Sequence, residues 1–273
     1  MTETSENSQL KLKDAILNKR MLICLFNGFS SGMPLYYIYQ LIPAWLRDYD
    51  TSLKTIGVFS LLTLPYALKP LWAPLLDRYS ILPLGRRRGW MLVSQVALFL
   101  LMISYSLFTP TTQIMLIGVI TLFVAFSSAT QDMALDSYRR ELLPDNELGL
   151  GNSFYMNAYR LSALIPASLG LVLADLVPWS VVHIIIGSFM FVGIIKTLMI
   201  KEITNNTKPP KTLKEAIIEP FKDFFSRDGV LSALIILAFI FFYKFGDTLA
   251  TALITPFYMD VGFTKSTIVC MAM

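Results

Sequence analysis

Charged residues are scarce in this sequence. Asp, Glu, Lys and Arg together make up 15% of its 273 residues, whereas a soluble domain carries about 25%. Hydrophobic residues reach 55%, and the mean hydropathy is +0.58. The apolar residues come in blocks of about 20, the length that crosses a bilayer core as a helix, and the alternating pattern of a membrane β-barrel is missing. The sequence therefore predicts an all-α integral membrane protein that crosses the bilayer several times.

Cysteine and histidine are also rare, with two cysteines and one histidine. Cys24 and Cys270 both lie in apolar runs, which favours small buried side chains over a disulfide. His183 has no metal-ligand spacing and no Ser/His/Asp set around it, so a packing or interfacial role is favoured. The carboxylates Asp132 and Asp136 lie too close to arginines for a protease dyad. These absences argue against an enzyme and against a metal site.

The net charge of +4 and the isoelectric point near 9.0 do not indicate a nucleic-acid-binding protein. The basic residues gather between the apolar blocks and do not line one helix or one patch. We therefore expect the lipid bilayer, and no nucleic acid, as a partner of this chain.

Seven apolar spans can be delimited, and a further apolar run begins in the last dozen residues. Glycines and prolines interrupt the first two spans, at Gly28, Gly32, Pro34, Pro65 and Pro70. Inside lipid such breaks are tolerated where neighbours or cavity water satisfy the freed backbone groups. Close helix packing and a gating hinge both remain open for them. The predicted spans are approximately 21–46, 56–76, 90–108, 113–135, 150–173, 181–200 and 230–259.

Lysine and arginine are distributed unevenly over the loops. The N-terminal tail and every second loop hold sixteen of them, whereas the alternate loops hold only Arg47 and Lys54. Because cytoplasmic loops carry the excess of positive charge, the N-terminus is predicted to be cytoplasmic. No cleavable signal peptide is visible, since residues 1–18 are polar and the first apolar block is long enough to span.

This layout predicts four parts. Residues 1–20 form a cytoplasmic tail, 21–200 a six-span bundle, 201–228 a cytoplasmic linker, and 229–273 the start of a second bundle. The order resembles one half of a two-bundle carrier and the beginning of the other half, in which the bundles rock about a central site. We therefore expect the chain to be incomplete relative to a working carrier.

Residues 129–144 close the fourth span with two carboxylates. Asp132 and Asp136 are four apart, so they share one face of a helix. Arg139 and Arg140 follow Asp136 at i+3 and i+4, which predicts a local pair there. Asp132 lies one turn deeper without such a neighbour, and an apolar medium favours the neutral form of a carboxyl group. Asp132 is therefore the candidate proton-coupling site, and a structural ion pair with arginines of the loop after the second span is the alternative.

That loop carries an Asp-Arg pair, then a glycine followed by three arginines. Asp77 can receive an arginine or cap a facing helix N-terminus. The pattern predicts a cytoplasmic latch that forms and breaks, and a positive-inside topology anchor is the alternative. The predicted latch residues are Asp77, Arg78, Arg86, Arg87, Asp136, Arg139 and Arg140.

The loop resembles the signature between spans two and three of the major facilitator superfamily, Gly-x-x-x-Asp-Arg-x-Gly-Arg-Arg. It departs where Ala73 replaces the first glycine and where six residues rather than one separate Arg78 from Gly85. With the preceding L-P-Y-A-L-K-P-L-W-A-P, this longer form is similar to the AmpG-type muropeptide permeases. The likeness extends to G-F-S-S-G-M-P at 28–34, A-W-L-R-D at 44–48, S-A-T-Q-D-M-A-L-D-S-Y-R-R-E-L-L-P at 128–144 and Y-K-F-G-D at 243–247. The related acetyl-coenzyme A transporters share parts of it.

The resemblance implies a major facilitator fold and a transport function. Members of the AmpG branch import anhydromuropeptides, which are products of peptidoglycan turnover, across the bacterial inner membrane with the proton gradient. A small glycopeptide and protons are then the partners, and no cofactor is needed. Two alternatives remain open: a carrier of acetyl-coenzyme A or another organic anion, and a truncated membrane protein without transport activity of its own.

Ionisable residues inside membrane spans are costly and mark substrate or ion sites. Arg160 and Lys244 suit the carboxylates of a peptide stem, because arginine can fork two hydrogen bonds and lysine offers a point charge. An ion pair between or within helices, such as Lys244 with Asp247, is the alternative. The predicted substrate-binding residues are Gln131, Asn157, Tyr159, Arg160, Tyr243, Lys244 and Lys69.

Overall fold

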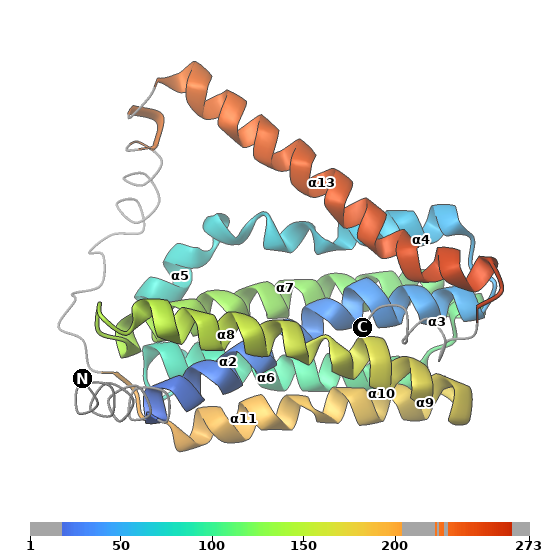
Figure 1. Cartoon of the computed structure of the whole chain (residues 1–273), viewed down its shortest axis with the longest axis horizontal. Helices are drawn as coiled ribbons and strands as arrows, with labels where there is room; N and C mark the ends of the chain where they lie inside the picture. The colour runs from blue at the N-terminus through green and yellow to red at the C-terminus, as the bar shows by residue number, and fades with distance from the viewer. Residues whose placement is uncertain (1–17, 204–221, 223, 227–228, 264–273) are drawn as a thin grey trace, which may run out of the picture.

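The computed structural model describes residues 18–203, 222, 224–226 and 229–263, and this part of the chain is all-helical. Long helices run nearly parallel to one another, and one further helix, α13, lies obliquely across the side that α4 occupies (Figure 1). The predicted tail up to residue 17, most of the predicted linker and the last ten residues lie outside the described residues.

Five helical stretches in the described residues are long and apolar enough to cross a membrane. They confirm the first, third, fourth, fifth and sixth predicted spans. Their exposed surface is rich in large apolar side chains such as Leu100, Met115 and Phe191, which suits contact with lipid. The five stretches are Lys19–Asp48 (α2 Lys19–Tyr36, η1 Tyr37–Leu41, α3 Ile42–Asp48), Arg86–Leu107 (α6 Arg86–Ser104, η4 Tyr105–Leu107), Pro110–Leu142 (α7), Leu148–Leu176 (α8 Leu148–Ser162, η5 Ile165–Leu169, α9 Gly170–Leu176) and Trp179–Met199 (α10 Trp179–Ser188, α11 Met190–Met199).

The second predicted span is helical but interrupted, in agreement with the prolines that break it in the sequence. Prolines 65, 70 and 74 each remove a backbone donor and restrict the residue before them, so the helix breaks repeatedly. The segment consists of α4 Leu53–Ser60, η2 Leu61–Tyr66, η3 Lys69–Leu71 and α5 Ala73–Arg78.

The seventh predicted span corresponds to α13, Val230–Asp260. Its described apolar part, Val230–Tyr243, is shorter than a full membrane crossing. The C-terminal half of α13 packs on the bundle through Leu253, Tyr258 and Met259. The Arg47 guanidinium pairs with Asp260 there.

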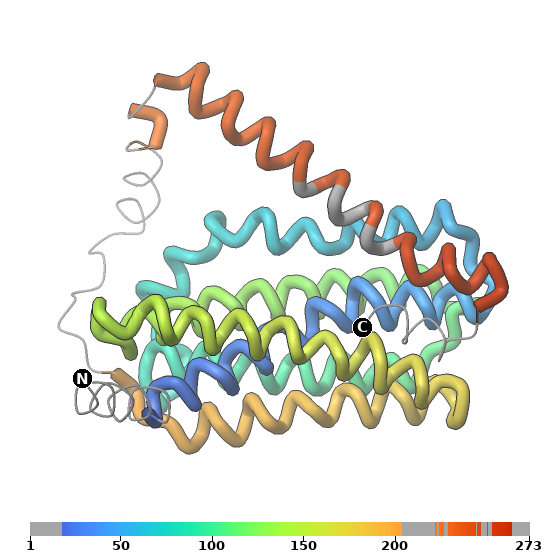
Figure 2. Tube along the Cα trace, in the orientation of Figure 1, coloured from blue at the N-terminus to red at the C-terminus, as the bar shows by residue number. Residues whose placement is uncertain are grey.

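The first and fifth spans lie side by side and fit closely (Figure 2). At Gly28 of α2, an added Cβ would lie 2.0 Å from the carbonyl oxygen of Tyr155 in α8, and at Gly32 it would lie 2.4 Å from that of Tyr159. The two glycines therefore serve close packing, which is one of the two roles that the sequence left open. Each of the two spans also contains a π-helical turn at or just after a proline, Pro34 or Pro166, where the missing N–H disturbs the regular ladder.

The main core lies between the first, third, fourth and sixth spans and contains several aromatic rings. His183 is fully buried there, with its Nδ1 atom 2.7 Å from the Tyr37 hydroxyl and its ring 4.5 Å from that of Trp45. The packing role predicted for His183 is confirmed. Cys24 is buried and free, whereas Cys270 lies outside the described residues.

Candidate functional site

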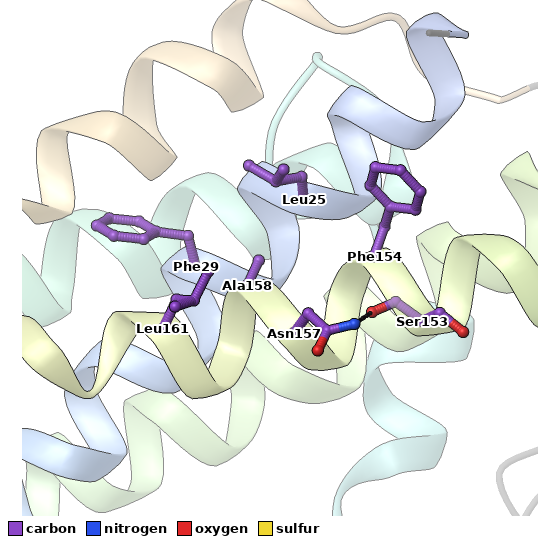
Figure 3. A pocket seen from close by; sticks show the side chains of 7 residues that line it. All are labelled: Leu25, Phe29, Ser153, Phe154, Asn157, Ala158 and Leu161. Carbon is purple, nitrogen blue, oxygen red and sulfur yellow. Dashed lines mark hydrogen bonds between the residues drawn. The ribbon is translucent and has the colours of Figure 1, made fainter. Parts of the chain in front are cut away.

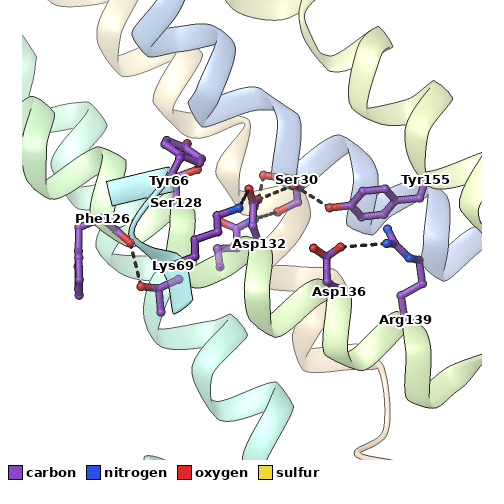
Figure 4. A network of polar contacts seen from close by, with 12 residues as sticks. Ser30, Tyr66, Lys69, Phe126, Ser128, Asp132, Asp136, Arg139 and Tyr155 are labelled. Carbon is purple, nitrogen blue, oxygen red and sulfur yellow. Dashed lines mark hydrogen bonds and ion pairs between the residues drawn. The ribbon is translucent and has the colours of Figure 1, made fainter. Parts of the chain in front are cut away.

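Asp132, which the sequence singled out, lies at the centre of a buried polar network in the middle of the bundle (Figure 4). Its Oδ1 atom accepts a hydrogen bond of 2.5 Å from the Ser31 hydroxyl of α2. Its Oδ2 atom lies 2.9 Å from Nζ of Lys69, the first residue of η3. Asp132 is the more deeply buried partner of this ion pair, with 12% of its side chain exposed against 27% for Lys69.

Hydroxyl groups extend this network to the neighbouring spans. The Tyr155 hydroxyl of α8 donates a hydrogen bond of 2.8 Å to Ser31 Oγ, which in turn donates to Asp132. The Tyr66 hydroxyl of η2 donates one of 2.6 Å to Ser128 of α7, and Lys69 Nζ lies 5.1 Å from the Tyr66 ring. The network around Asp132 thus joins the first, second, fourth and fifth spans.

The ion pair corrects the expectation that Asp132 has no near cation. It also replaces the alternative that the sequence left open, because the partner is Lys69 and not an arginine of the loop after the second span. Lys69 is 63 residues away in the chain and lies where the second span breaks. Its contact with Asp132 depends on how the segments pack, so spacing alone did not pair the two residues.

Gln131 is fully buried, and its side chain contacts other parts of the protein interior. Its amide nitrogen donates to both the carbonyl oxygen and the hydroxyl of Ser30, each at 2.8 Å. The Gln95 amide of α6 reaches the same hydroxyl at 3.3 Å. In this conformation Gln131 links α7 to α2 by hydrogen bonds next to Asp132. Its side chain does not reach a surface that a ligand could contact.

Sequence reasoning missed Ser30, Ser31, Tyr66 and Tyr155. The available signal was the occurrence of paired hydroxyl residues between Gly28 and Gly32, because a polar residue at a close helix contact must find a partner across it.

Among the other predicted substrate-binding residues, those whose side chains the structure describes make no hydrogen bond or ion pair with Asp132. The Asn157 amide donates to the carbonyl oxygen of Ser153 in its own helix at 2.8 Å, and Tyr159 packs on Tyr36 with ring centroids 5.6 Å apart. Arg160 is exposed. The Tyr243 ring is exposed on α13, and the side chains of Lys244 and Asp247 lie outside the described part of the structure.

Asn157 instead lines a groove of about 310 Å³ between α2 and α8 (Figure 3). The groove walls are mostly apolar and contain no charged side chain. The groove therefore offers no cation to a carboxylate, whereas Lys69 beside Asp132 does. The lining residues are Leu25, Phe29, Ser153, Phe154, Asn157, Ala158 and Leu161.

A second charged cluster, the Arg87 cluster, joins the ends of α5, α6 and α7. Arg87 is nearly buried, and its guanidinium lies 2.7 Å from Asp77 and 2.9 Å from Glu141. Arg86 donates to the carbonyl oxygen of Asp77 at 2.8 Å. Glu202, which follows α11, accepts from the backbone N–H groups of Arg87 at 2.8 Å and Arg88 at 3.0 Å. A carboxylate at a helix N-terminus is stabilising because those N–H groups lack partners in the helix.

Gly85 makes this capping contact possible. Its φ of +107° and the 2.4 Å that would separate an added Cβ from the Glu202 side chain both exclude other residues. The sequence predicted the positions of Asp77, Arg86 and Arg87 in a cluster but missed Glu141 and Glu202, which are acidic partners from distant segments.

The seven predicted latch residues do not form one cluster. Asp136 pairs with Arg139 at 3.0 Å as predicted, but Arg140 pairs with Asp145 at 3.0 Å and not with Asp136. No ion pair among the described residues joins Asp136 to Asp77 or Arg78, since Asp77 pairs with Arg87 instead. Among the described residues Arg78 joins no ion pair, and its guanidinium lies 5.4 Å from the Tyr79 ring.

Replacing Arg87 with alanine is expected to destabilise the bundle by about 3 kcal/mol, because it leaves two carboxylates without their shared cation. Arg78→Ala is the matched control, and we expect it to cost less than about 0.5 kcal/mol, since an exposed side chain away from special features is removed. Thermal unfolding of the purified variants in the same detergent compares them. Equal stability of the two variants would show that the Arg87 cluster does not hold the helix ends together.

Comparison with known proteins places this arrangement in a family. Residues 16–273 match the family described as the Major Facilitator Superfamily. The chain belongs to this superfamily. Its candidate spans agree with a multi-pass membrane protein of this superfamily, whose members are transporters rather than enzymes.

The similar curated proteins are bacterial. An uncharacterised protein of Haemophilus influenzae is 48% identical over 265 residues, which is 94% of this chain and 61% of that protein. The anhydromuropeptide permease of Escherichia coli is 38% identical over 246 residues, covering 89% of this chain and 50% of that protein. A protein of Rickettsia felis named as an AmpG transporter is 30% identical over 256 residues, covering 90% and 61%. The resemblance to AmpG-type permeases is thus confirmed, and the chain spans between half and two thirds of the length of these relatives.

Proposed function

We propose that this transporter imports anhydromuropeptides across the bacterial inner membrane by proton symport, and so serves peptidoglycan recycling. The observation that carries the proposal is the ion pair of Asp132 with Lys69, buried within the bundle of a chain that is 38% identical to an anhydromuropeptide permease. Charges inside a membrane bundle are expensive to keep, so a pair at this depth points to a pathway for ions or substrate.

Asp132 suits the role of the proton-coupling residue. A carboxylate can gain and lose a proton without a change of shape, and its interactions with Ser31 and Lys69 depend on which form is present. The loss of its negative charge would remove the electrostatic attraction to Lys69, whereas a hydroxyl donor such as Ser31 can serve either form. Protonation therefore has a local structural consequence, as coupling requires.

The substrate has carboxylates on its peptide stem and hydroxyl groups on its sugars, and the proposed contacts follow this chemistry. Lys69, Arg160 and Lys244 are assigned to carboxylates, and Asn157, Tyr159 and Tyr243 to hydroxyl and amide groups. Gln131 is omitted from this set because its side chain is fully buried against Ser30. Since the contact residues lie on separate helices, we assign them to a central path that closes around substrate during alternating access.

The orientation and the parts of the chain are proposed from the loop charges. Lysine and arginine crowd the N-terminal tail and every second loop, so these segments and the linker at 201–228 are assigned to the cytoplasm. Residues 21–200 then form one bundle, and 229–273 begin another. The Arg87 cluster would lie at the cytoplasmic end and act as a latch that keeps the helix ends together while the bundle moves.

Uptake of labelled anhydromuropeptide into proteoliposomes that contain the protein from its native gene tests this function. We expect accumulation inside when the outside is more acidic, no accumulation without a pH gradient, and no inhibition by excess acetyl-coenzyme A. Inhibition by acetyl-coenzyme A together with its own uptake would identify the organic-anion carrier instead. The absence of any uptake by correctly inserted protein would support the reading as a membrane protein inactive in transport by itself.

A further inference from the structure

We propose that Asp132 and a carboxylate of the substrate compete for Lys69, so that protonation of Asp132 transfers this lysine from the protein to the substrate. The inference rests on the proposed function and deepens it. It identifies Lys69 as the residue that binds the anionic group of the substrate. It also identifies protonation of Asp132 as the event that makes Lys69 available.

The two partners of the ion pair have different access to the outside of the bundle. Asp132 lies on α7 and is mostly enclosed by the bundle. Its Oδ1 atom accepts a hydrogen bond from the Ser31 hydroxyl of α2. Lys69 is the more exposed partner and comes from a three-residue turn between exposed neighbours, Leu68 and Pro70. An ammonium group has three donors, and only the one to Asp132 is used among the described contacts of Lys69. A ligand therefore approaches Lys69 and not Asp132.

The charged and titratable groups around the pair leave one unbalanced charge when Asp132 takes up a proton. On α7, Asp136 is within electrostatic range of Lys69, but it is already paired with Arg139 at 3.0 Å. From η2, the Tyr66 ring lies beneath the Lys69 ammonium group. This ring attracts the cation whether Asp132 is protonated or ionised. From α8, Tyr155 reaches Asp132 only through Ser31, and Tyr159 is the other phenol in electrostatic range.

The neutral form of Asp132 keeps a hydrogen-bond partner in Ser31, whereas Lys69 loses the partner of its positive charge. A protonated carboxyl group keeps acceptor capacity for the Ser31 hydroxyl. Lys69 loses its counter-ion, and a partly buried charge without a partner is strongly destabilising. A carboxylate from the substrate restores the pair. The site then holds one proton and one substrate carboxylate more than before, and its net charge is the same as in the resting state.

Protonation and substrate binding therefore favour each other. Because such coupling is reciprocal, a bound carboxylate must raise the affinity of Asp132 for a proton by the same factor. The binding of one proton to Asp132 is therefore coupled to the binding of one substrate carboxylate to Lys69. A sugar without an anionic group would lack this tie.

Binding of two probes to the purified protein in nanodiscs tests the proposal. The probes are anhydromuropeptide with free stem carboxylates and the same compound with those carboxylates amidated, measured between about pH 5.5 and 7.5, where carboxyl groups of ordinary pKa stay ionised. The wild type should bind the free acid at least about tenfold more tightly than the amide, since hydrogen bonds to charged groups carry that much, and this preference should grow as the pH falls.

Lys69→Gln should lose the part of the free-acid preference that grows as the pH falls, and Asp132→Asn should prefer the free acid by the same factor at every pH in the range. Lys54→Gln, an exposed lysine of α4, is the control and should match the wild type. Because Lys69→Gln leaves Asp132 unpaired, the neutral double variant Lys69→Gln with Asp132→Asn provides a further comparison. Its preference for the free acid should not depend on pH and should be smaller than that of Asp132→Asn.

A free-acid preference in the double variant as large as that of Asp132→Asn would overturn the assignment of Lys69. A pH-dependent preference in Asp132→Asn would overturn the role of Asp132 in releasing it. If the correctly folded wild type binds neither probe, the proposed function itself fails, and that result is distinct from the other two.

Discussion

Replacing Asp132 with asparagine is expected to abolish the accumulation of substrate against its gradient while leaving exchange of internal for external substrate intact. The amide has the shape of the carboxylic acid and can still accept the Ser31 hydroxyl bond, which is 2.5 Å long in the native protein. It cannot carry a proton. At a pH difference of about one unit, one symported proton supports roughly a tenfold concentration ratio, since one pH unit corresponds to about 1.4 kcal/mol. The variant should reach a ratio of about one.

Accumulation and counterflow assays in the same proteoliposomes separate these two activities. Asp136→Asn is the matched control, because Asp136 lies one turn further along α7, is exposed and pairs with Arg139. We expect the control to accumulate substrate as the wild type does. Accumulation by Asp132→Asn at the level of the wild type would remove Asp132 as the coupling residue, and loss of both activities would assign it to substrate binding instead.

Replacing Gly28 with alanine is expected to prevent stable assembly of α2 against α8. The added Cβ would lie 2.0 Å from the Tyr155 carbonyl oxygen, and a backbone atom cannot move aside as the end of a side chain can. Overpacking of a filled interior costs about 3 kcal/mol, and here the two helices must separate along the contact that carries Ser31 and Tyr155. The same displacement would break the hydroxyl chain to Asp132.

Gly149→Ala is the control for this substitution, because nothing lies within 4 Å of an added Cβ there. Alanine favours a helix over glycine by about 1 kcal/mol, so the control is expected to be neutral or stabilising. The yield of monodisperse protein and the unfolding temperature in detergent measure both variants. If Gly28→Ala matched Gly149→Ala in these measurements, the close contact of α2 and α8 would be wrong.

The sequence predicted the membrane class and most of the spans because the bilayer imposes a fixed length on apolar helices. It also predicted that Asp132 and the Asp77 loop matter, since charges in apolar surroundings stand out in any one-dimensional pattern. Three prolines in ten residues also predicted that the second span is interrupted, but the sequence did not show where its short helical pieces begin and end. Hydropathy measures whether a segment is apolar enough to be buried in lipid, and it does not measure how the backbone bends.

The partners of the charged residues were the least predictable part of the site. Asp136 with Arg139 could be predicted because the contact is local. Lys69 with Asp132, and Glu141 and Glu202 with Arg87, join segments that are far apart in the chain. Their pairing depends on how the helices pack, which a single sequence does not record. Gln131 shows the same limit. Its neighbour Asp132 forms the ion pair, whereas the Gln131 amide donates a hydrogen bond from α7 to Ser30 of α2.

Proton movement during uptake tests the central claim most directly. Proteoliposomes with the wild-type protein, at equal pH inside and outside and with the membrane potential clamped at zero, should show alkalinisation of the medium when anhydromuropeptide is added outside. Asp132→Asn should transport the labelled compound inward down its gradient without that pH change. Uptake by the wild type without alkalinisation, or an equal proton signal from the variant, would contradict proton symport through Asp132.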